Sequence, residues 1–153
     1  MAIRILVVDD HDVVRQGVRL ILEGHPEWEI CGEADNGNDA LTRVQELQPD
    51  LVILDISMPG KDGLDVAKEL QARRSRTKII VLTMHDSKEL SLALKEVGAK
   101  GYVVKSHAAR DLVRAIQTVI DGKDFFEFDG PAARREKPPR KPLFRLTLLP
   151  AIG

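Results

Sequence analysis

The chain has 153 residues, a formal net charge of -1 and only 4% aromatic residues, so it is long enough for one domain with a largely aliphatic core. No apolar run reaches about 18 residues and the N-terminus lacks a signal-peptide pattern, which argues against a membrane or secreted protein and favours a cytoplasmic one. Residues 131–153 hold six basic residues and one acidic residue, whereas residues 1–130 hold 17 basic and 23 acidic residues, so the acidic part is a poor partner for nucleic acid.

Apolar runs of strand length alternate along the chain with segments of helical periodicity. The predicted strands are IRILVV (3–8), WEICGEA (28–34), LVIL (51–54), KIIVL (78–82) and GYVV (101–104). Val14 and Val18 mark the apolar face of the first helical segment, and Pro49 stops the second. Gly98 and Gly122 stand where the ends of the fourth and fifth helices favour glycine.

Five strands that alternate with five helices predict an α/β fold. Near-continuous apolar strands are typical of parallel pairing with helices on both faces, so we expect a doubly wound five-stranded sheet in the flavodoxin-like order 2-1-3-4-5. Cys31, the single cysteine, cannot form an internal disulfide and is interpreted as a small buried apolar residue of the second strand. In such sheets ligands bind beyond the carboxyl ends of the strands, where functional residues are therefore sought.

Side chains that can bind a ligand or take part in a reaction follow four of the five predicted strands: Asp9, Asp10, Asp12, Asp55, Thr83 and Lys105. Each has an ordinary structural interpretation when taken alone. An aspartate can cap the helix that begins near His11, a threonine can form a turn, and a lysine can be a solvated surface charge. Because the carboxyl ends of parallel strands meet at one edge of the sheet, their conjunction predicts a single site.

Carboxylates held close together raise one another's pKa unless a cation lies between them, and oxygen ligands with room for water favour Mg²⁺. Asp55 could then act as a nucleophile toward phosphorus, while the ion, Lys105 and Thr83 stabilise charge on the transferred group. The loop SMPGKDG is expected to wrap back after Asp55, so that a main-chain carbonyl, that of Ser57, completes the metal shell. The predicted product is an aspartyl phosphate.

These motifs resemble the receiver domain of bacterial two-component response regulators. The matching segments are the pair Asp9-Asp10, LVILDISMPGKDG around Asp55, VLT ending in Thr83, and GYVVKS with Tyr102 and Lys105. HDVVRQGVRLIL, VLTMHD and GYVVKS also resemble the NarL/FixJ subfamily, whose members carry a LuxR-type helix-turn-helix output domain. The resemblance implies that Asp55 accepts a phosphoryl group from a sensor histidine kinase, with Mg²⁺ as cofactor. Beyond its own phosphorylation and dephosphorylation, it implies no enzymatic activity.

The resemblance also implies roles for individual residues around the acceptor. Asp10 and Asp55 would bind Mg²⁺ directly, Asp9 through water, and Ser57 through its backbone carbonyl.

A switch pair is implied as well, in which Thr83 moves to the phosphoryl group and the Tyr102 ring follows inward. Lys105 would pair with the phosphoryl group, while Ser57 and His85 would tune the lifetime of the phosphate. The kinase would dock near the mouth of the site, against the first helix.

The end of the chain departs from the family pattern. We expect a receiver domain at residues 1–124 and a tail at residues 125–153; five prolines and six basic residues from Asp129 onward favour a disordered or loosely extended segment. Nothing after Asp129 resembles a helix-turn-helix, so this chain alone is not expected to bind DNA sequence-specifically. Ser106 follows Lys105 where many receivers have proline, which disfavours a cis peptide bond there.

Two other interpretations remain open at this stage. VVDDHDVV resembles the first motif of haloacid-dehalogenase-type phosphatases, with Asp10 as nucleophile, although the second acidic pair of that family is missing and Asp55 would have no function. A receiver-fold interaction module that works without phosphate is the other alternative. Homodimerisation is a further hypothesis, since Val113 and Ile120 extend apolar surface beyond the core stripe of the fifth helix.

Overall fold

The computed structural model describes residues 2–126, and the predictions for residues 127–153 lie outside this range. Five parallel strands form one sheet in the order β2-β1-β3-β4-β5. They are β1 (Ile3–Val8), β2 (Trp28–Ala34), β3 (Leu51–Asp55), β4 (Lys78–Thr83) and β5 (Gly101–Val104). The α/β fold, the parallel pairing and the strand order predicted from the sequence are confirmed, with every strand boundary within one residue.

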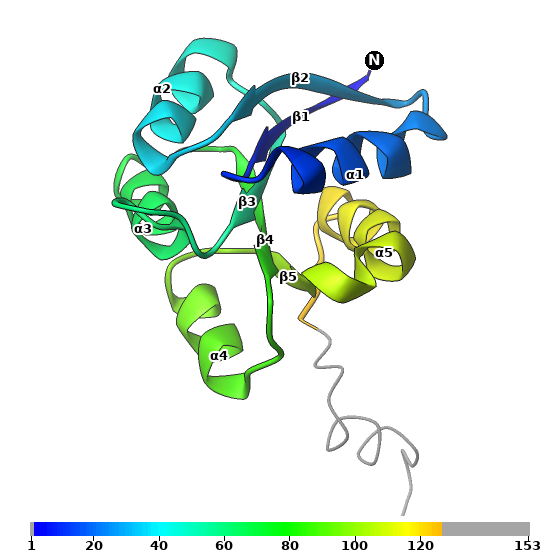
Figure 1. The fold of residues 1–153 in the computed structure, drawn as a ribbon. Coiled ribbons are helices and arrows are strands. Elements are labelled where there is room, and N and C mark those ends of the chain that lie inside the picture. The colour runs from blue at the N-terminus through cyan, green and yellow to red at the C-terminus, as the bar shows by residue number, and fades with distance from the viewer. Residues whose placement is uncertain (1, 127–153) are drawn as a thin grey trace, which may run out of the picture.

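Helices cover both faces of this sheet. They are α1 (Asp12–Glu23), α2 (Gly37–Leu47), α3 (Gly63–Ala72), α4 (Lys88–Glu96) and α5 (Ala108–Ile120), with a short 3₁₀ turn at Lys105–His107 before α5. Helices α2, α3 and α4 lie on one face and α1 and α5 on the other (Figure 1). This is the doubly wound arrangement that right-handed crossovers produce.

Each strand contributes to two separate apolar cores because successive side chains point to opposite faces of the sheet. In β3, Val52 and Leu54 pack beneath α2, α3 and α4, whereas Leu51 and Ile53 pack beneath α1 and α5. All five residues of β3 are buried, as expected for the central strand of a parallel sheet. The central strand therefore holds its last residue, Asp55, on a rigid backbone.

The helix ends follow the sequence signals at several positions. Asp62 forms a capping box with Asp65 at the start of α3. Gly98 and Gly122 both have φ of 89°, the left-handed conformation predicted from their positions after α4 and α5. Gln48 after α2 and Arg74 after α3 adopt the same left-handed region, with φ of 47° and 55°, although neither is a glycine.

The interpretation of Cys31 as a buried residue is wrong. Cys31 is only half-buried. It lies on the edge strand β2, where the register with β1 shifts between Ile5 and Leu6, and this irregularity takes it out of the regular inward alternation.

Among the described helices, none combines the length and apolar character needed to cross a membrane.

Beyond α5 the chain returns to the sheet and adds a short contact beside β5. Phe125 is buried, donates its N–H to the carbonyl of Lys100 at 2.8 Å, and accepts from the N–H of Tyr102 at 3.0 Å. The ring of Phe126 packs at 5.9 Å from that of Tyr102. The expected boundary between domain and tail after residue 124 stays a prediction.

Candidate functional site

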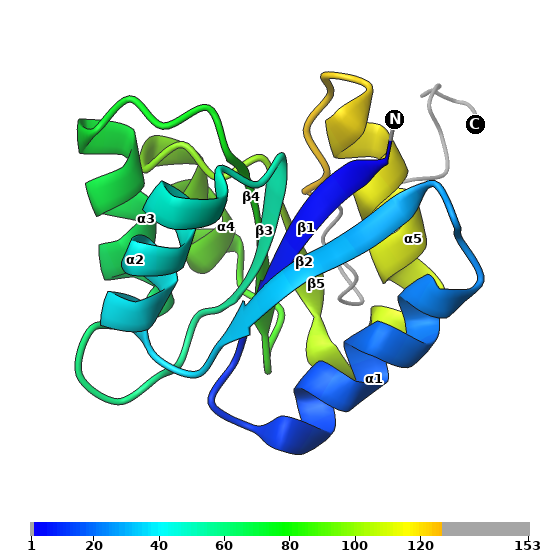
Figure 2. The ribbon, with the colours of Figure 1, turned by 90° about the horizontal axis from the view of Figure 1, so that it is seen from above.

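Four of the predicted site residues meet beyond the carboxyl ends of the strands. Asp9 follows β1, Asp55 ends β3, Thr83 ends β4, and Lys105 follows β5. Figure 2 shows that the segments after β1 and β3 leave the sheet at the same edge. The topology thus brings together residues separated by almost a hundred positions in the sequence, as the strand-end rule predicts.

Lys105 connects two buried carboxylates at the centre of the site. Its Nζ lies 3.0 Å from Asp9 Oδ2 and 3.1 Å from Asp55 Oδ1. The Asp9 side chain is 0% exposed and that of Asp55 1%, so both carboxylates are removed from bulk water. The sequence indicated Lys105 as a partner of the phosphoryl group, but its contact with Asp9 was not predicted.

Asp9, Asp55 and Lys105 form a triad in which the positive charge of one lysine faces two buried carboxylates. Burial raises the pKa of the Asp55 carboxyl above its ordinary value, against the opposing effects of Lys105 and the Ser57 N–H. Burial alone would lower the pKa of the Lys105 ammonium, but hydrogen bonds to Asp9 and Asp55 outweigh it and raise that pKa. Lys105 therefore stays protonated, and one ammonium still does not compensate fully for the desolvated carboxylate of Asp55.

The loop between β3 and α3 folds back over Asp55, as the Pro and Gly residues of the sequence predict. The N–H of Ser57 donates to Asp55 Oδ1 at 3.2 Å, and the N–H of Gly63 donates to the carbonyl of Ile56 at 3.0 Å. A Cβ on Gly63 would lie 2.4 Å from the carbonyl oxygen of Asp55, and one on Gly37 would lie 2.4 Å from that of Lys61. Glycine at both positions allows the loop to pack tightly against the acceptor strand and α2.

Thr83 is 4% exposed and is bonded to its own loop rather than to Asp55. Its hydroxyl donates to the carbonyl of His85 at 3.3 Å and accepts from the N–H of His85 at 3.4 Å. Tyr102, the predicted switch partner, is 1% exposed, so its ring already lies inside the molecule. No peptide bond in the described residues is cis, in agreement with the expectation for the bond before Ser106.

The alternative that the aspartates after β1 cap the first helix is not what the structure shows. The N-cap of α1 is His11, which has no side-chain capping bond, and Asp12 instead pairs with Arg15 on the surface of the helix. Asp9 accepts from the backbone N–H of His11 at 2.9 Å but points its other oxygen at Lys105. Asp9 and Asp10 are therefore available to the site.

His11 is the site residue that the sequence reasoning missed. Its Nδ1 lies 3.2 Å from Asp9 Oδ1 and 3.1 Å from Asp10 Oδ1. The imidazole thus stands at the mouth beside both carboxylates of the acidic pair. Its position immediately after that pair was the only available signal, because a single histidine at the start of a helix is usually a surface residue.

The donor set fits a hard divalent cation. One atom each from Asp9, Asp10, His11 and Asp55 can be chosen so that all lie within 4.8 Å of one another. Asp55 Oδ2 is buried and has no hydrogen-bond partner in the described part of the chain. A buried carboxylate oxygen without a partner is costly, and a coordinated cation would satisfy it.

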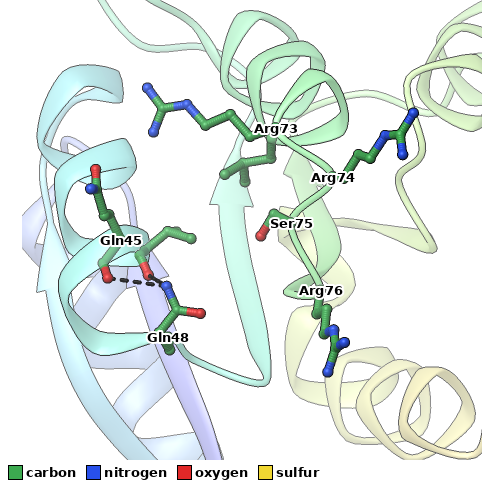
Figure 3. Close-up of a pocket in the computed structure, with 8 residues that line it drawn as sticks. Gln45, Gln48, Arg73, Arg74, Ser75 and Arg76 are labelled. Atoms are coloured by element: carbon green, nitrogen blue, oxygen red, sulfur yellow. Dashed lines mark hydrogen bonds between the residues drawn. The ribbon is translucent and has the colours of Figure 1, made fainter.

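A separate pocket lies elsewhere in the described part of the molecule, at the amino ends of β3 and β4. It has a volume of about 560 Å³ and is lined mainly by polar and basic residues: Val44, Gln45, Gln48, Leu70, Arg73, Arg74, Ser75 and Arg76. Figure 3 shows the labelled arginine side chains extending in different directions from the segment after α3, so their guanidinium groups do not converge on one ligand position. We therefore identify the candidate functional site at the carboxyl ends of the strands, where reactive side chains converge, and not at this pocket.

The comparisons with known proteins agree with this geometry. A family model described as the response regulator receiver domain matches residues 5–117. The transcriptional regulatory protein YdfI of Bacillus subtilis is 36% identical over 126 residues, which cover 82% of this chain and 59% of that protein. The response regulator UvrY of Escherichia coli is 37% identical over 127 residues, which cover 83% and 58% respectively.

A solved structure extends the likeness to the backbone. The isolated REC domain of RcsB from Salmonella enterica, determined in the presence of the phosphomimetic BeF3-, has a TM-score of 0.77 and 28% identity, and the match covers 88% of this chain and 98% of that one. The chain spans about three-fifths of the length of the curated relatives named above.

Proposed function

Because this chain belongs to the response-regulator receiver family, we propose that it accepts a phosphoryl group on Asp55 and changes conformation in response. The observation that carries the proposal is the state of the Asp55 carboxylate. It is 1% exposed, one oxygen lies 3.1 Å from Lys105 Nζ, and the other has no hydrogen-bond partner within residues 2–126. A buried carboxylate with so few hydrogen-bond partners is a good nucleophile toward phosphorus.

In the proposed reaction, an oxygen of Asp55 attacks the phosphorus of a phosphohistidine on a sensor histidine kinase. A P–O bond forms, the P–N bond breaks, and the leaving imidazole takes up a proton from water. Lys105 remains protonated and balances negative charge on the phosphoryl oxygens. Mg²⁺, when bound, would supply further charge neutralisation; Asp10, Asp55 and the Ser57 carbonyl would hold it directly, and Asp9 through water.

The proposed conformational response involves Thr83. At present its hydroxyl is bonded to the backbone of His85, so it must exchange that bond for one to the phosphoryl group. Since the Tyr102 ring is already buried, its proposed role as a switch partner is to shift within the core rather than to enter it. Such a change needs only a few kcal/mol of differential stabilisation, roughly, which charge-assisted hydrogen bonds supply. Ser57 and His85 keep their proposed role in the lifetime of the phosphate.

Helix α1 offers a surface for the proposed kinase. Val13 and Leu20 lie seven positions apart on one face of the helix and are 79% and 67% exposed. These exposed apolar side chains, on the helix that begins at the mouth of the site, offer contacts to a protein partner. Helix α5 offers less for homodimerisation, because Val113 and Ile120 pack partly against the core.

Radiolabelled acetyl phosphate with Mg²⁺ tests the proposal directly. We expect wild-type protein to incorporate label, EDTA to prevent it, and Asp55→Asn to abolish it. Asp12→Asn is the matched control, since Asp12 is 79% exposed and outside the triad, and it should be labelled like wild type.

The other outcomes separate the rival functions. Label that persists in Asp55→Asn but disappears in Asp10→Asn would favour the phosphatase. Folded wild-type protein that takes no label would favour the phosphate-independent interaction module.

A further inference from the structure

We propose that His11 is a direct ligand in the cation site, so that the site binds imidazole-preferring divalent ions such as Ni²⁺ more tightly than its oxygen ligands alone would allow. The proposal rests on the cation site of the proposed function. It adds a nitrogen ligand to that site, and with it a different order of preference among metal ions.

The positions of three donor atoms support this role. Nδ1 of His11 lies 3.2 Å from Asp9 Oδ1 and 3.1 Å from Asp10 Oδ1. Neighbouring ligands around an octahedral ion with bonds of about 2.1 to 2.2 Å are separated by about 3.0 Å. The spacing between His11 Nδ1 and Asp10 Oδ1 matches one edge of such an octahedron, with Asp9 bound through water as proposed above. The distance between the imidazole nitrogen and the Asp10 carboxylate is therefore that of two ligands of one ion, without any rearrangement of the chain.

A buried, unpartnered oxygen provides an independent indication that an ion belongs here. Asp55 Oδ2 is without a hydrogen bond among the described residues, and its side chain is 1% exposed. One donor atom of Asp55 can be chosen within 4.8 Å of the donors of Asp9, Asp10 and His11. Opposite ligands of an octahedral ion are about 4.3 Å apart, so Asp10, His11 and Asp55 can bind one ion directly after a small adjustment, with Asp9 bound through water.

The chemistry of imidazole determines which ions gain from His11. Carboxylate, carbonyl and water ligands suit Mg²⁺, whereas imidazole suits Ni²⁺, Zn²⁺ and Cu²⁺, whose affinities for nitrogen ligands exceed that of Mn²⁺. Mg²⁺ would gain little from the nitrogen atom. The side chain of His11 is 65% exposed, so an ion can reach it from solvent.

The rival explanation is that His11 only donates an Nδ1–H hydrogen bond to Asp9 and never contacts the ion. In that case the residue would act equally on all divalent ions, through the orientation of Asp9 and Asp10. A comparison of two ions with different ligand preferences therefore distinguishes a ligand from an orienting group.

The experiment uses tag-free full-length protein without a phosphodonor. Isothermal titration calorimetry measures the binding of Ni²⁺ and of Mg²⁺ to wild type, His11→Ala and His25→Gln. His25 is the control histidine, because it stacks on Trp28 and pairs with Glu27 at the amino end of β2, opposite the carboxyl ends that form the site. We expect His11→Ala to weaken Ni²⁺ binding by about tenfold or more while Mg²⁺ affinity changes by less than about threefold.

Pulsed electron paramagnetic resonance of bound Cu²⁺, an ion that prefers imidazole, gives a second readout that does not depend on affinity. Wild type should show coupling to a directly bound ¹⁴N nucleus, and His11→Ala should lack it. Equal losses for both metals, or no ¹⁴N coupling in wild type, would overturn the proposal. Phosphorylation of wild type with Mg²⁺ tests the receiver function separately, so the two proposals can fail independently.

Discussion

Asp55 carries its charge in a place that water scarcely reaches. Burial raises the pKa of its carboxyl above the ordinary value of 3.8, which means that the folded protein favours the protonated form more than the unfolded chain does. As pH rises from about 3.8 through the folded pKa, the unfolded state loses its proton first and the fold loses stability. The negative charge of the Asp55 carboxylate thus costs stability, and the proposed phosphorylation needs that charge.

The first prediction concerns the removal of that charge. Asp55→Asn should increase the free energy of unfolding at pH 7 by about 1 kcal/mol, or roughly 3 to 5 °C in Tm for a domain of this size. The gain should shrink as pH falls toward 3.8, the ordinary pKa of the group, because wild type then carries less charge at Asp55. Thermal melts followed by circular dichroism across this pH range measure both effects.

Added Mg²⁺ provides the control for this prediction. It should raise the Tm of wild type but scarcely that of Asp55→Asn, since a ligand stabilises only the state that binds it. A lower Tm for Asp55→Asn at pH 7 without metal would contradict the electrostatic account of Asp55.

At the scale of elements, the loop from β3 to α3 depends on close backbone contacts. A Cβ at Gly63 would lie 2.4 Å from the carbonyl oxygen of Asp55 and 2.8 Å from Cα of Ile56, and both atoms belong to the backbone. Neither can yield as a flexible side chain would. The loop that covers the acceptor must therefore move if residue 63 is larger than glycine.

The second prediction compares two glycines. Gly63→Ala should destabilise the fold by about 2 kcal/mol through overpacking and should slow labelling of Asp55, because the loop carrying Ser57 is displaced. Gly17→Ala in α1 is the matched control: a Cβ there has no neighbour within 4 Å outside its own helix, so the change should stabilise by about 0.5 to 1 kcal/mol. Urea unfolding and the labelling rate measure the pair, and equal stability of the two variants would refute the packing argument.

The third prediction concerns the left-handed residues that line the pocket at the amino ends of β3 and β4. Arg74, with φ of 55°, has no hydrogen bond from its side chain among those found in the described residues, so Arg74→Gly should stabilise by about 1 kcal/mol. Gln48, with φ of 47°, donates from its amide to the carbonyls of Val44 and Gln45 at the end of α2, so Gln48→Gly loses those bonds and should be nearly neutral. Chemical denaturation distinguishes the two, and destabilisation by Arg74→Gly would show that its side chain contributes contacts that offset the backbone cost.

At the scale of the whole molecule, the remaining question is assembly. The fourth prediction is that beryllofluoride with Mg²⁺ shifts wild type from monomer toward dimer in sedimentation velocity, while Asp55→Asn stays monomeric. The expected shift is modest, because Val113 and Ile120 pack partly against the core and leave less apolar surface on α5 than their sequence positions indicated. A monomer under both conditions would remove the homodimer hypothesis.

The sequence predicts the fold of this molecule well because four of its five strands, all but β2, are largely apolar runs bounded by charged or turn-forming residues. The same regularity locates Asp9, Asp55 and Lys105, since strand ends in a parallel sheet share one edge. It does not show which oxygen of Asp9 faces Lys105, nor that His11 turns toward the acidic pair, because those contacts depend on side-chain rotamers.

Backbone features set by long-range contacts also escape a pattern-based prediction. The left-handed conformation of Arg74 occurs where glycine is the usual residue, and the need for glycine at position 63 arises from a strand eight residues earlier. The half-buried state of Cys31 follows from a local shift in register that no apolar run reveals. These features depend on how elements meet rather than on what each element contains.

The return of the chain beside β5 has a mechanical consequence. Phe125 is joined to the backbone of Tyr102 by a hydrogen bond of 3.0 Å, and the Phe126 ring lies between the Tyr102 ring and the ammonium of Lys95, which is 4.9 Å from its centroid. A displacement of Tyr102 is therefore transmitted directly to Phe125 and Phe126, through the backbone hydrogen bond and the ring contact. Two direct contacts thus couple the buried Tyr102 to the last residues that the structure describes.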